Sequence, residues 1–446
     1  MKLTPEGIRL GGGLSRRDFI RCSTLAAAAW MTGCATNPVT GKSELMLVSE
    51  QDELAVDRQH SPFQISADYG VVQDRKLARY VAQTGKGMVP GTHRPQMPYR
   101  FEVVNATYVN AYAFPGGTIA TTRGILLQID NEAELASLLG HELGHVNARH
   151  TARQMSKAAL TQTLVGGASA IAGGQGSGLG NLVGQMGSLS AGALLASYSR
   201  DNEREADDLG LRYMAAAGYN PDGFKDLMDM LRNLSRHKAN AVELLFATHP
   251  MSDERYQTAI EAIRTRYPDR TGKPIYRERY QDHTAGLRRI AGAIEAMQNG
   301  EKEMARKKYP AAEKQFLTAL KKAPRDYAAH IMMAKCQYLQ ERFANATRYA
   351  RDASQIDPQE PQAQLIMGIA RINIGQFDKA FDNFERCDRL LPGNPELLFL
   401  KGLSREGSQR KEESARFYIA YLKVVQQGPH AQHAYQRLVD WGYMQP

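Results

Sequence analysis

Cysteine is scarce in this chain, and long apolar runs are missing from it. Only four of the 446 residues are cysteines, which excludes a small domain held together by disulfides. Cys336 and Cys387 lie far from the N-terminus, and the sequence is compatible with either a disulfide between them or two buried free thiols. No stretch reaches the roughly eighteen apolar residues that a membrane-spanning helix needs, so no such helix is predicted.

Charge of one sign does not dominate either. The chain has 56 Lys and Arg against 47 Asp and Glu, a formal net charge of +9. No nucleic-acid-binding motif accompanies this modest excess, so a nucleic-acid partner is not predicted. A slightly basic surface would suit an anionic membrane or acidic protein segments. The length predicts two or more domains, and 43% hydrophobic residues indicate a globular protein.

The first 33 residues are typical of an export signal. Ser15-Arg16-Arg17-Asp18-Phe19-Ile20 matches a twin-arginine pattern, and a short alanine-rich segment follows it. Met31-Thr32-Gly33-Cys34 resembles a lipobox, which predicts cleavage before Cys34 and lipidation of its thiol. The alternative is an unprocessed amphipathic N-terminus with a chance cysteine. We expect an exported, lipid-anchored protein of the bacterial periplasm, attached to the outer membrane.

A metal-binding pattern, H-E-x-x-H, stands in the middle of a predicted amphipathic helix. Each residue advances by about 100°, so His141 and His145 lie about 40° apart and both imidazoles can reach one cation. Glu142, about 100° around the helix, suits a carboxylate that contacts the attacking water and not the metal. His150 falls about 180° from His141 on the same ideal helix, so we expect it to face away.

A catalytic zinc usually takes three protein ligands, and a later acidic helix offers the third. Glu203 and Asp207 share one face of that helix at positions i and i+4, and Glu205 lies between them. One carboxylate would bind the metal while another orients a ligand imidazole. Spacing alone does not choose among the three, and a solvated charged face is the alternative.

Three motifs in this order, H-E-L-G-H, S-R-x-x-E-x-x-A-D and T-H-P-x-x-x-x-R, make the chain resemble a known family. It is similar to the gluzincin zinc metallopeptidases that include HtpX and the CaaX prenyl protease, over about residues 40–265. The resemblance implies one Zn²⁺ per chain. It also implies that His141, His145 and Glu203 are the zinc ligands, that Glu142 is the catalytic base and that Asp207 supports a ligand.

The same resemblance assigns further site residues. His249-Pro250 matches the family's His-Pro motif and Arg255 its arginine, and the histidine is implicated either in stabilising the transition state or in blocking the metal as a fourth ligand. His249 or Arg255 would stabilise the oxyanion. An edge strand at Asn110, Ala111 and Tyr112 would pair with an extended substrate, although an ordinary edge strand fits as well.

The C-terminal third repeats itself. Pro324, Pro358 and Pro392 follow one another at intervals of 34 residues, which is the tetratricopeptide period. In the same register run two columns of small residues and one column of aromatic residues, namely Ala312, Ala346, Ala380 and Ser414; Gly300, Ala334, Gly368 and Gly402; and Tyr309, Phe343 and Phe377. The period predicts a solenoid of paired helices that binds peptides or partner proteins.

These patterns predict a mainly α fold, of class α+β, in which a zinc-metalloprotease domain with a small β-sheet precedes a tetratricopeptide α-solenoid. Strands are expected at 101–105 and 111–122, and a helix at 74–87. For the glycine-rich stretch 166–192, a lid, a disordered insertion and a membrane-touching loop all remain open. The predicted divisions are a signal peptide at 1–33, the protease domain at 34–266, a linker at 267–290 and the repeats at 291–446.

The predicted function is zinc-dependent cleavage of misfolded or stalled periplasmic proteins. Within the resembling family, the layout with repeats implies quality control of outer-membrane β-barrel proteins, with the repeats recruiting clients or assembly partners. The alternative is a chaperone-like assembly scaffold in which proteolysis is secondary or latent. Because twin-arginine export carries folded proteins, we also hypothesise that a neutral His249 keeps the enzyme latent until it is exported.

Overall fold

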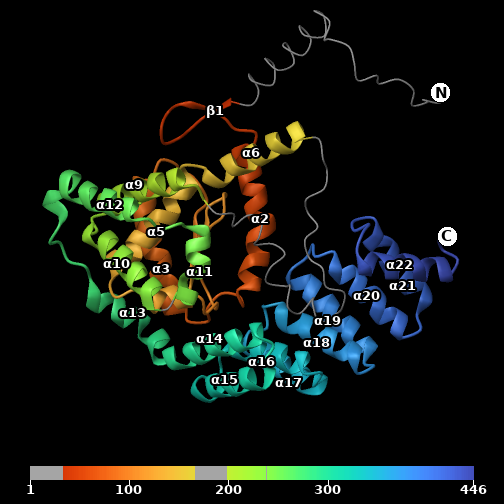
Figure 1. Ribbon diagram of the computed structural model, residues 1–446. Coiled ribbons are helices and arrows are strands. Elements are labelled where there is room, and N and C mark those ends of the chain that lie inside the picture. The colour runs from red at the N-terminus through yellow and green to blue at the C-terminus, as the bar shows by residue number, and fades with distance from the viewer. Residues whose placement is uncertain (1–33, 166–197, 238, 446) are drawn as a thin grey trace, which may run out of the picture.

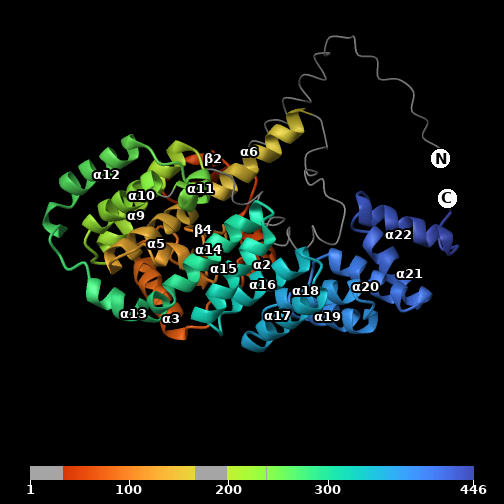
Figure 2. The ribbon, with the colours of Figure 1, turned by 60° about the horizontal axis from the view of Figure 1, so that its bottom comes forward.

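The computed structural model describes residues 34–165, 198–237 and 239–445. An N-terminal part, built around a central helix, is followed by paired helices that begin below it in Figure 1 and continue to the right, away from it (Figures 1 and 2). The predicted signal peptide and the glycine-rich stretch lie outside the described residues. Within the described part of the chain, no helix is both long and apolar enough to cross a bilayer.

The N-terminal part opens with a hairpin and two capped helices. Strands β1 (Cys34–Thr36) and β2 (Ser43–Leu45) pair antiparallel. Ser49 caps helix α2 (Glu50–Ala67) in a capping box with Asp52. Asp74 caps α3 (Arg75–Met88), close to the predicted bounds, and the short helix η1 (Val89–Gly91) follows. Polar side chains placed before these helices thus satisfy backbone N–H groups that would otherwise lack a partner.

The sheet has three short strands in the order β3-β5-β4. Strand β3 (Arg100–Val104) pairs parallel with β5 (Thr118–Thr122), and β4 (Ala111–Ala113) pairs antiparallel with β5. The two predicted strand segments are therefore confirmed, with the second broken into β4 and β5 at Pro115-Gly116-Gly117. Strand β4 lies at one edge of the sheet that the described residues form, and β3 lies at the other.

The central helix is α5 (Glu132–Asn147), which is buried along its whole length. It packs against α3, α9 and α10 and against the sheet, so that every face meets protein and the site it carries is shielded from bulk water. The remaining elements of this part are α4 (Arg123–Leu126), α6 (His150–Val165), α9 (Arg200–Ala216), α10 (Asp222–His237), α11 (Ala239–Thr248), α12 (Asp253–Arg266), η2 (Pro268–Arg270) and α13 (Arg277–Arg289). The predicted linker 267–290 thus contains η2 and α13.

The C-terminal part consists of helix pairs at the predicted 34-residue period. Its helices are α14 (Ala291–Ala305), α15 (Tyr309–Lys322), α16 (Tyr327–Leu339), α17 (Phe343–Ile356), α18 (Gln362–Asn373), α19 (Phe377–Leu390), α20 (Glu396–Gly407), α21 (Lys411–Leu422) and α22 (Pro429–Asp440). A Cβ atom on Gly300 would lie 2.3 Å from the Phe316 ring, and one on Gly368 would lie 2.4 Å from the Phe384 ring. Gly300 and Gly368 therefore lack a side chain because an aromatic ring of the partner helix packs on each of them. The tetratricopeptide solenoid is confirmed, and Cys336 and Cys387 are free, buried thiols within it.

The two parts meet at the C-terminal end of α2, where four ionisable side chains are enclosed. We call Asp68, Glu301, Lys335 and Glu360 the interface charge cluster. Tyr69 donates a hydrogen bond to Glu301 at 3.1 Å, and the Lys335 ammonium lies 4.8 Å from the centre of the Tyr69 ring. Ser66 donates to Glu360, whose side chain is enclosed so fully that the residue is only 8% exposed. Three acids against one lysine make this interface sensitive to protonation.

Replacing Glu360 by Gln should therefore change how stability depends on pH. Burial raises the pKa of Glu360 to about 8, whereas an unfolded chain releases that proton near pH 4.5. The folded form then holds more protons between these values, so its free energy of unfolding falls as the pH rises through that window. We expect Glu360→Gln to lie close to the wild type at pH 5 and to be more stable by about 4 kcal/mol at pH 8 to 9.

The measurement is chemical unfolding of both chains across this pH range, with the difference between them plotted against pH. Other titrating groups cancel in that difference because both chains carry them. Burial also lowers the pKa of Lys335 to about 8, so Lys335→Met serves as the opposite control and should remove a rise in stability above pH 8. A difference between Glu360→Gln and wild type that stays constant with pH would contradict the buried, protonated carboxyl.

Candidate metal centre

Helix α5 brings the two histidines of H-E-x-x-H together. Asn131 accepts a hydrogen bond from the Glu134 N–H group and so starts the helix at the polar residues that precede it. The Nε2 atoms of His141 and His145 lie 3.0 Å apart, and both residues are buried. The spacing argument from the sequence therefore describes this pair of imidazoles correctly.

Helix α9 crosses α5 at very close range because glycines line the crossing. A Cβ atom on Gly144 would lie 2.7 Å from the carbonyl oxygen of Ala206, closer than real Cβ atoms approach. A Cβ atom on Gly140 would lie 3.0 Å from the carbonyl oxygen of Gly210. The backbones can approach in this way only without side chains at the contact. The crossing places Glu203, on the first turn of α9, next to His141 and His145.

Four buried ligand atoms converge at this crossing. Glu203 Oε1 lies 3.3 Å from His145 Nε2, and Glu203 Oε2 lies 3.6 Å from His141 Nε2. His249, just after α11, places Nδ1 3.1 Å from Glu203 Oε1 and 3.3 Å from His141 Nε2. All four ligand atoms lie within 4.8 Å of one another.

The donor set fits zinc. Imidazole nitrogens together with a carboxylate oxygen are ligands that Zn²⁺ takes in proteins, and four donors suit its tetrahedral preference. Burial opposes a charge on Glu203, but the surrounding imidazoles lower the pKa of its carboxyl nonetheless. A carboxylate that stays ionised although it is buried is what a buried divalent cation requires. The residues present therefore fit the metal.

Glu142 lies beside the four ligand residues, and one of its two carboxylate oxygens makes no hydrogen bond to a described residue. Its Oε1 atom is 3.8 Å from His249 Nε2, and its Oε2 atom accepts no hydrogen bond from any described residue although it is buried. Burial raises the pKa of its carboxyl, against the opposing effect of His249 and His141. A carboxyl group with raised pKa and a free oxygen is suited to moving protons near neutral pH.

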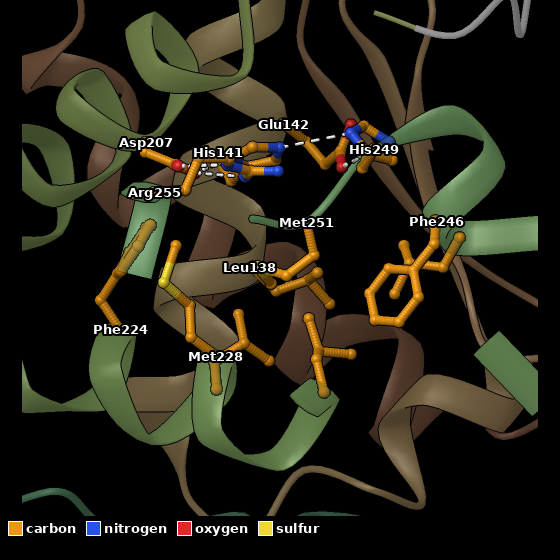
Figure 3. A pocket seen from close by; sticks show the side chains of 13 residues that line it. Leu138, His141, Glu142, Asp207, Phe224, Met228, Phe246, His249, Met251 and Arg255 are labelled. Carbon is orange, nitrogen blue, oxygen red and sulfur yellow. Dashed lines mark hydrogen bonds and ion pairs between the residues drawn. The ribbon is translucent and has the colours of Figure 1, made fainter. Parts of the chain in front are cut away.

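His141 is held from behind by a carboxylate and an arginine. Its Nδ1 atom lies 2.9 Å from Asp207, and Arg255 donates to Asp207 through Nε and Nη2, both at 2.8 Å (Figure 3). Although burial opposes ionisation, Arg255 and His141 lower the pKa of Asp207. Arg255 also contacts Glu203 at 2.7 Å and the Pro250 carbonyl oxygen at 2.7 Å. With these acceptors in place, we propose that Arg255 positions the acidic residues and does not contact an oxyanion.

His150 was predicted to face away from the metal, and it is not among the four ligand residues, but it lies against the His145 ring. Helix α5 ends at Asn147, Arg149 adopts a left-handed φ of 55°, and α6 begins at His150, so one ideal helix does not describe this stretch. His150 Nδ1 lies 2.8 Å from His145 Nδ1. The turn has neither glycine nor proline at Arg149, and the sequence therefore offers no signal for it.

The three acidic residues of α9 that the spacing left undecided are separated by their contacts. Glu203 joins the four ligand atoms, and Asp207 contacts His141. Glu205 instead contacts His150, with its Oε2 atom 3.0 Å from His150 Nε2. The three carboxylates thus differ in the histidines that they contact.

The predicted substrate strand lies at the sheet edge. Ala111 and Tyr112 belong to β4, and Asn110 precedes it with its backbone paired to Thr122. The Asn110 side chain is buried, and neither its oxygen nor its nitrogen has a hydrogen-bond partner among the described residues. Tyr112 is turned away, because its hydroxyl donates to Asp68 of the interface charge cluster at 2.6 Å. Asn110 is therefore the member of this group with unused hydrogen-bonding capacity.

An apolar pocket adjoins the cluster. Figure 3 shows His141, Glu142 and His249 along one side and a group of apolar side chains facing them. The apolar lining comes from α5, α10, α11 and the turn after α11, and consists of Leu138, Phe224, Leu227, Met228, Leu231, Leu245, Phe246 and Met251. Its chemistry suits an apolar side chain held next to Glu142.

Comparisons with known proteins place this geometry among peptidases. Residues 75–263 match the sequence model of Peptidase family M48. The beta-barrel assembly-enhancing protease of Yersinia pestis is 31% identical over 242 residues, which cover 53% of this chain and 48% of that protein. Its Escherichia coli K12 counterpart is 28% identical over 201 residues, covering 44% and 41%. Metalloprotease YcaL of Escherichia coli K12 is 28% identical over 241 residues, covering 52% of this chain and 91% of YcaL.

The chain spans about half the length of the first two of these relatives. The resemblance found in the motifs is nonetheless confirmed, because the matched residues hold the H-E-x-x-H helix, Glu203 and the His-Pro motif. Members of this family depend on zinc, in agreement with the donor set of the cluster. Residues 75–263 are thus similar to peptidase family M48.

Proposed function

We propose that this protein is a zinc-dependent endopeptidase of the bacterial periplasm that cuts misfolded or stalled proteins. The observation that supports it is the convergence of His141, His145 and Glu203 from two helices, with the Glu142 carboxyl buried beside them. A purely structural zinc site has no use for such a neighbour, since structural sites are closed by their ligands.

The proposed reaction is hydrolysis of a peptide bond. Zinc, when bound by His141, His145 and Glu203, would supply Lewis-acid polarisation of the scissile carbonyl and acidify the attacking water. Glu142 takes the proton from that water through its unpartnered Oε2 atom and passes it to the leaving amine. Asp207 holds His141 in place through Nδ1, so that Nε2 keeps its lone pair for the metal.

We propose that the substrate binds in an extended conformation along β4. Backbone hydrogen bonds to an edge strand hold a peptide with little dependence on its sequence, which suits misfolded clients of many kinds. The unpartnered amide of Asn110 would hydrogen-bond the peptide backbone near the scissile bond. The apolar pocket beside Glu142 would take a neighbouring apolar side chain, a type that misfolded proteins expose.

For His249 we propose the role of a fourth metal ligand that restrains activity. Its Nδ1 atom faces Glu203 and His141, and only its Nε2 atom faces Glu142. This orientation supports the ligand role over stabilisation of the transition state, which needs a group directed at the substrate. A site closed by four protein ligands lacks the open position that catalysis uses.

Replacing His249 by Ala should accordingly raise basal proteolysis severalfold. The measurement is the initial rate of casein cleavage by the zinc-loaded protein, with zinc content determined for each sample. His283→Ala is the matched control, because His283 stacks on Tyr80 away from the metal centre and should leave the rate unchanged. A rate that collapses at full zinc occupancy would instead assign His249 to the transition state.

The division into parts is also proposed to serve export and recruitment. Residues 1–33 would be a twin-arginine signal peptide, and lipid on Cys34 would anchor the protein, to the outer membrane. The protease domain would cover 34–266 and the linker 267–290, and the repeats at 291–446 would bind clients or outer-membrane assembly machinery. Similarity to beta-barrel assembly-enhancing proteases supports a role in β-barrel quality control.

The second candidate function is a chaperone-like scaffold that needs no proteolysis. The extensive repeat part is the observation that favours it, because solenoids of this kind typically bind partners and do not catalyse reactions. The test compares wild type and Glu142→Gln in two assays, cleavage of casein and restoration of β-barrel assembly in cells that lack the protein. Equal cleavage by both chains would remove the proposed mechanism, whereas restoration of assembly by Glu142→Gln would support the scaffold.

A further inference from the structure

The metal ligand His145 is backed by a chain of polar contacts that the proposed reaction does not use. His145 Nδ1 lies 2.8 Å from His150 Nδ1, and His150 Nε2 lies 3.0 Å from Glu205 Oε2. Arg153 donates to the same Glu205 oxygen at 2.7 Å. Three elements contribute, because His145 lies on α5, His150 and Arg153 lie on α6, and Glu205 lies on α9.

The backbone is shaped to make the first of these contacts. Between α5 and α6 the chain turns through Arg149, a non-glycine residue with a φ of 55°, a conformation that L-residues adopt at a cost. Arg149 is held there by hydrogen bonds to Glu53 at 3.1 Å and to the Val48 carbonyl at 2.8 Å. The result is that the fully buried His150 ring meets the His145 ring at its Nδ1 edge.

Hydrogen-bond chemistry allows only one arrangement of protons along this chain that leaves His145 able to bind a metal. The Glu205 carboxylate only accepts, so His150 must carry its proton on Nε2, which leaves a lone pair on its Nδ1 atom. His145 must then donate from Nδ1, and its lone pair falls on Nε2. That Nε2 atom is the one that faces His141 and Glu203.

We propose that His150 is a positioning residue for the metal ligand His145, selecting its Nδ1–H tautomer and fixing its ring, with Glu205 and Arg153 orienting His150 in turn. The inference rests on the proposed metal site at His145. The two histidine ligands then differ in the group that holds their Nδ1 atom. For His141 this group is a carboxylate, and for His145 it is a second imidazole. Partners of this kind behind a ligand typically influence metal affinity by about 10- to 100-fold.

Two substitutions at His150 separate hydrogen bonding from simple space filling. His150→Leu fills the site but accepts no hydrogen bond. His150→Asn places its Oδ1 atom on Cγ, where Nδ1 stood, and so retains an acceptor for His145. We expect the zinc affinity to fall about 10- to 100-fold in His150→Leu and to stay close to wild type in His150→Asn.

A second pair of variants tests the outer end of the chain. Glu205→Gln offers His150 a side-chain N–H as well as an oxygen, which weakens the choice of tautomer, so we expect a smaller loss of zinc affinity than in His150→Leu. Asp208→Asn is the matched control, because Asp208 lies on the same helix and, among the described residues, forms its ion pair with Arg266 at the surface. It should bind zinc as the wild type does.

The experiment uses the full chain and measures zinc affinity by chelator competition, together with the visible spectrum of the Co²⁺-loaded protein. A changed spectrum in His150→Leu, restored in His150→Asn, is the expected result and is one that loss of folding alone would not produce. Wild-type affinity and spectrum in His150→Leu would overturn the inference, as would an equal loss in Leu and Asn. If the wild type itself binds no zinc, the proposed function fails first, so the two failures are distinguishable.

Discussion

Glu142→Gln is expected to lower peptide-bond cleavage by about 10²- to 10⁴-fold, the range over which a positioned proton-transfer group accelerates a reaction. The change keeps the shape of the side chain and removes its ability to accept a proton. Glu142 lies on the second position of the motif with Oε2 directed at no described residue, so the substitution breaks no hydrogen bond that supports the fold. The measurement is the rate of casein cleavage by zinc-loaded wild type and variant.

Zinc content decides how a loss of activity is interpreted. The ligand atoms come from His141, His145, Glu203 and His249, and not from Glu142, so Glu142→Gln should bind zinc as the wild type does. Glu134→Gln is the matched control, because Glu134 is also a partly desolvated carboxyl of α5 but caps the helix start by bonding with Asn131 and Asp130. Loss of activity in both variants, or loss of zinc in Glu142→Gln, would contradict the role of Glu142 as the base.

Local patterns predicted most of the fold because local physics decides those features. The 34-residue period reports a helix pair whose glycine admits an aromatic ring, as Gly300 and Phe316 show. Ser49 and Asp74 could be predicted as caps because the backbone N–H groups at the start of a helix need acceptors. In the same way, the i, i+4 spacing of His141 and His145 requires only that the stretch be helical.

The missed features depend on contacts between distant segments. His150 reaches His145 through a left-handed turn at Arg149, which is stabilised by Glu53 nearly a hundred positions earlier. The interface charge cluster joins Asp68 to Lys335 and Glu360, and no periodicity links such positions. A pattern can therefore nominate a ligand, but the partner that orients it emerges only when the helices are packed.

Replacing Arg255 by Leu should cost about 3–5 kcal/mol in the free energy of unfolding of the metal-free chain, because it leaves buried charges without their partner. Arg255 pairs with both Glu203 and Asp207, and all three side chains are buried. Arg255→Lys should lie between wild type and Leu, since one ammonium group does not reproduce the two parallel contacts to Asp207. Urea unfolding of the three chains provides the comparison.

The matched control is Arg264→Leu on the same helix, α12. Arg264 pairs with Glu261 at 2.7 Å, but the two side chains are 74% and 57% exposed, so removing the pair should cost less than about 1 kcal/mol. Zinc should stabilise every chain that keeps the site, so the quantity to compare is the cost relative to wild type at the same zinc concentration. Zinc should reduce this cost for Arg255→Leu, because a bound cation would neutralise Glu203 and leave only Asp207 unpaired, and should leave it unchanged for Arg264→Leu. Equal costs for the two arginines, or a zinc effect of the same size on both, would show that Arg255 is not the counter-charge of the metal centre.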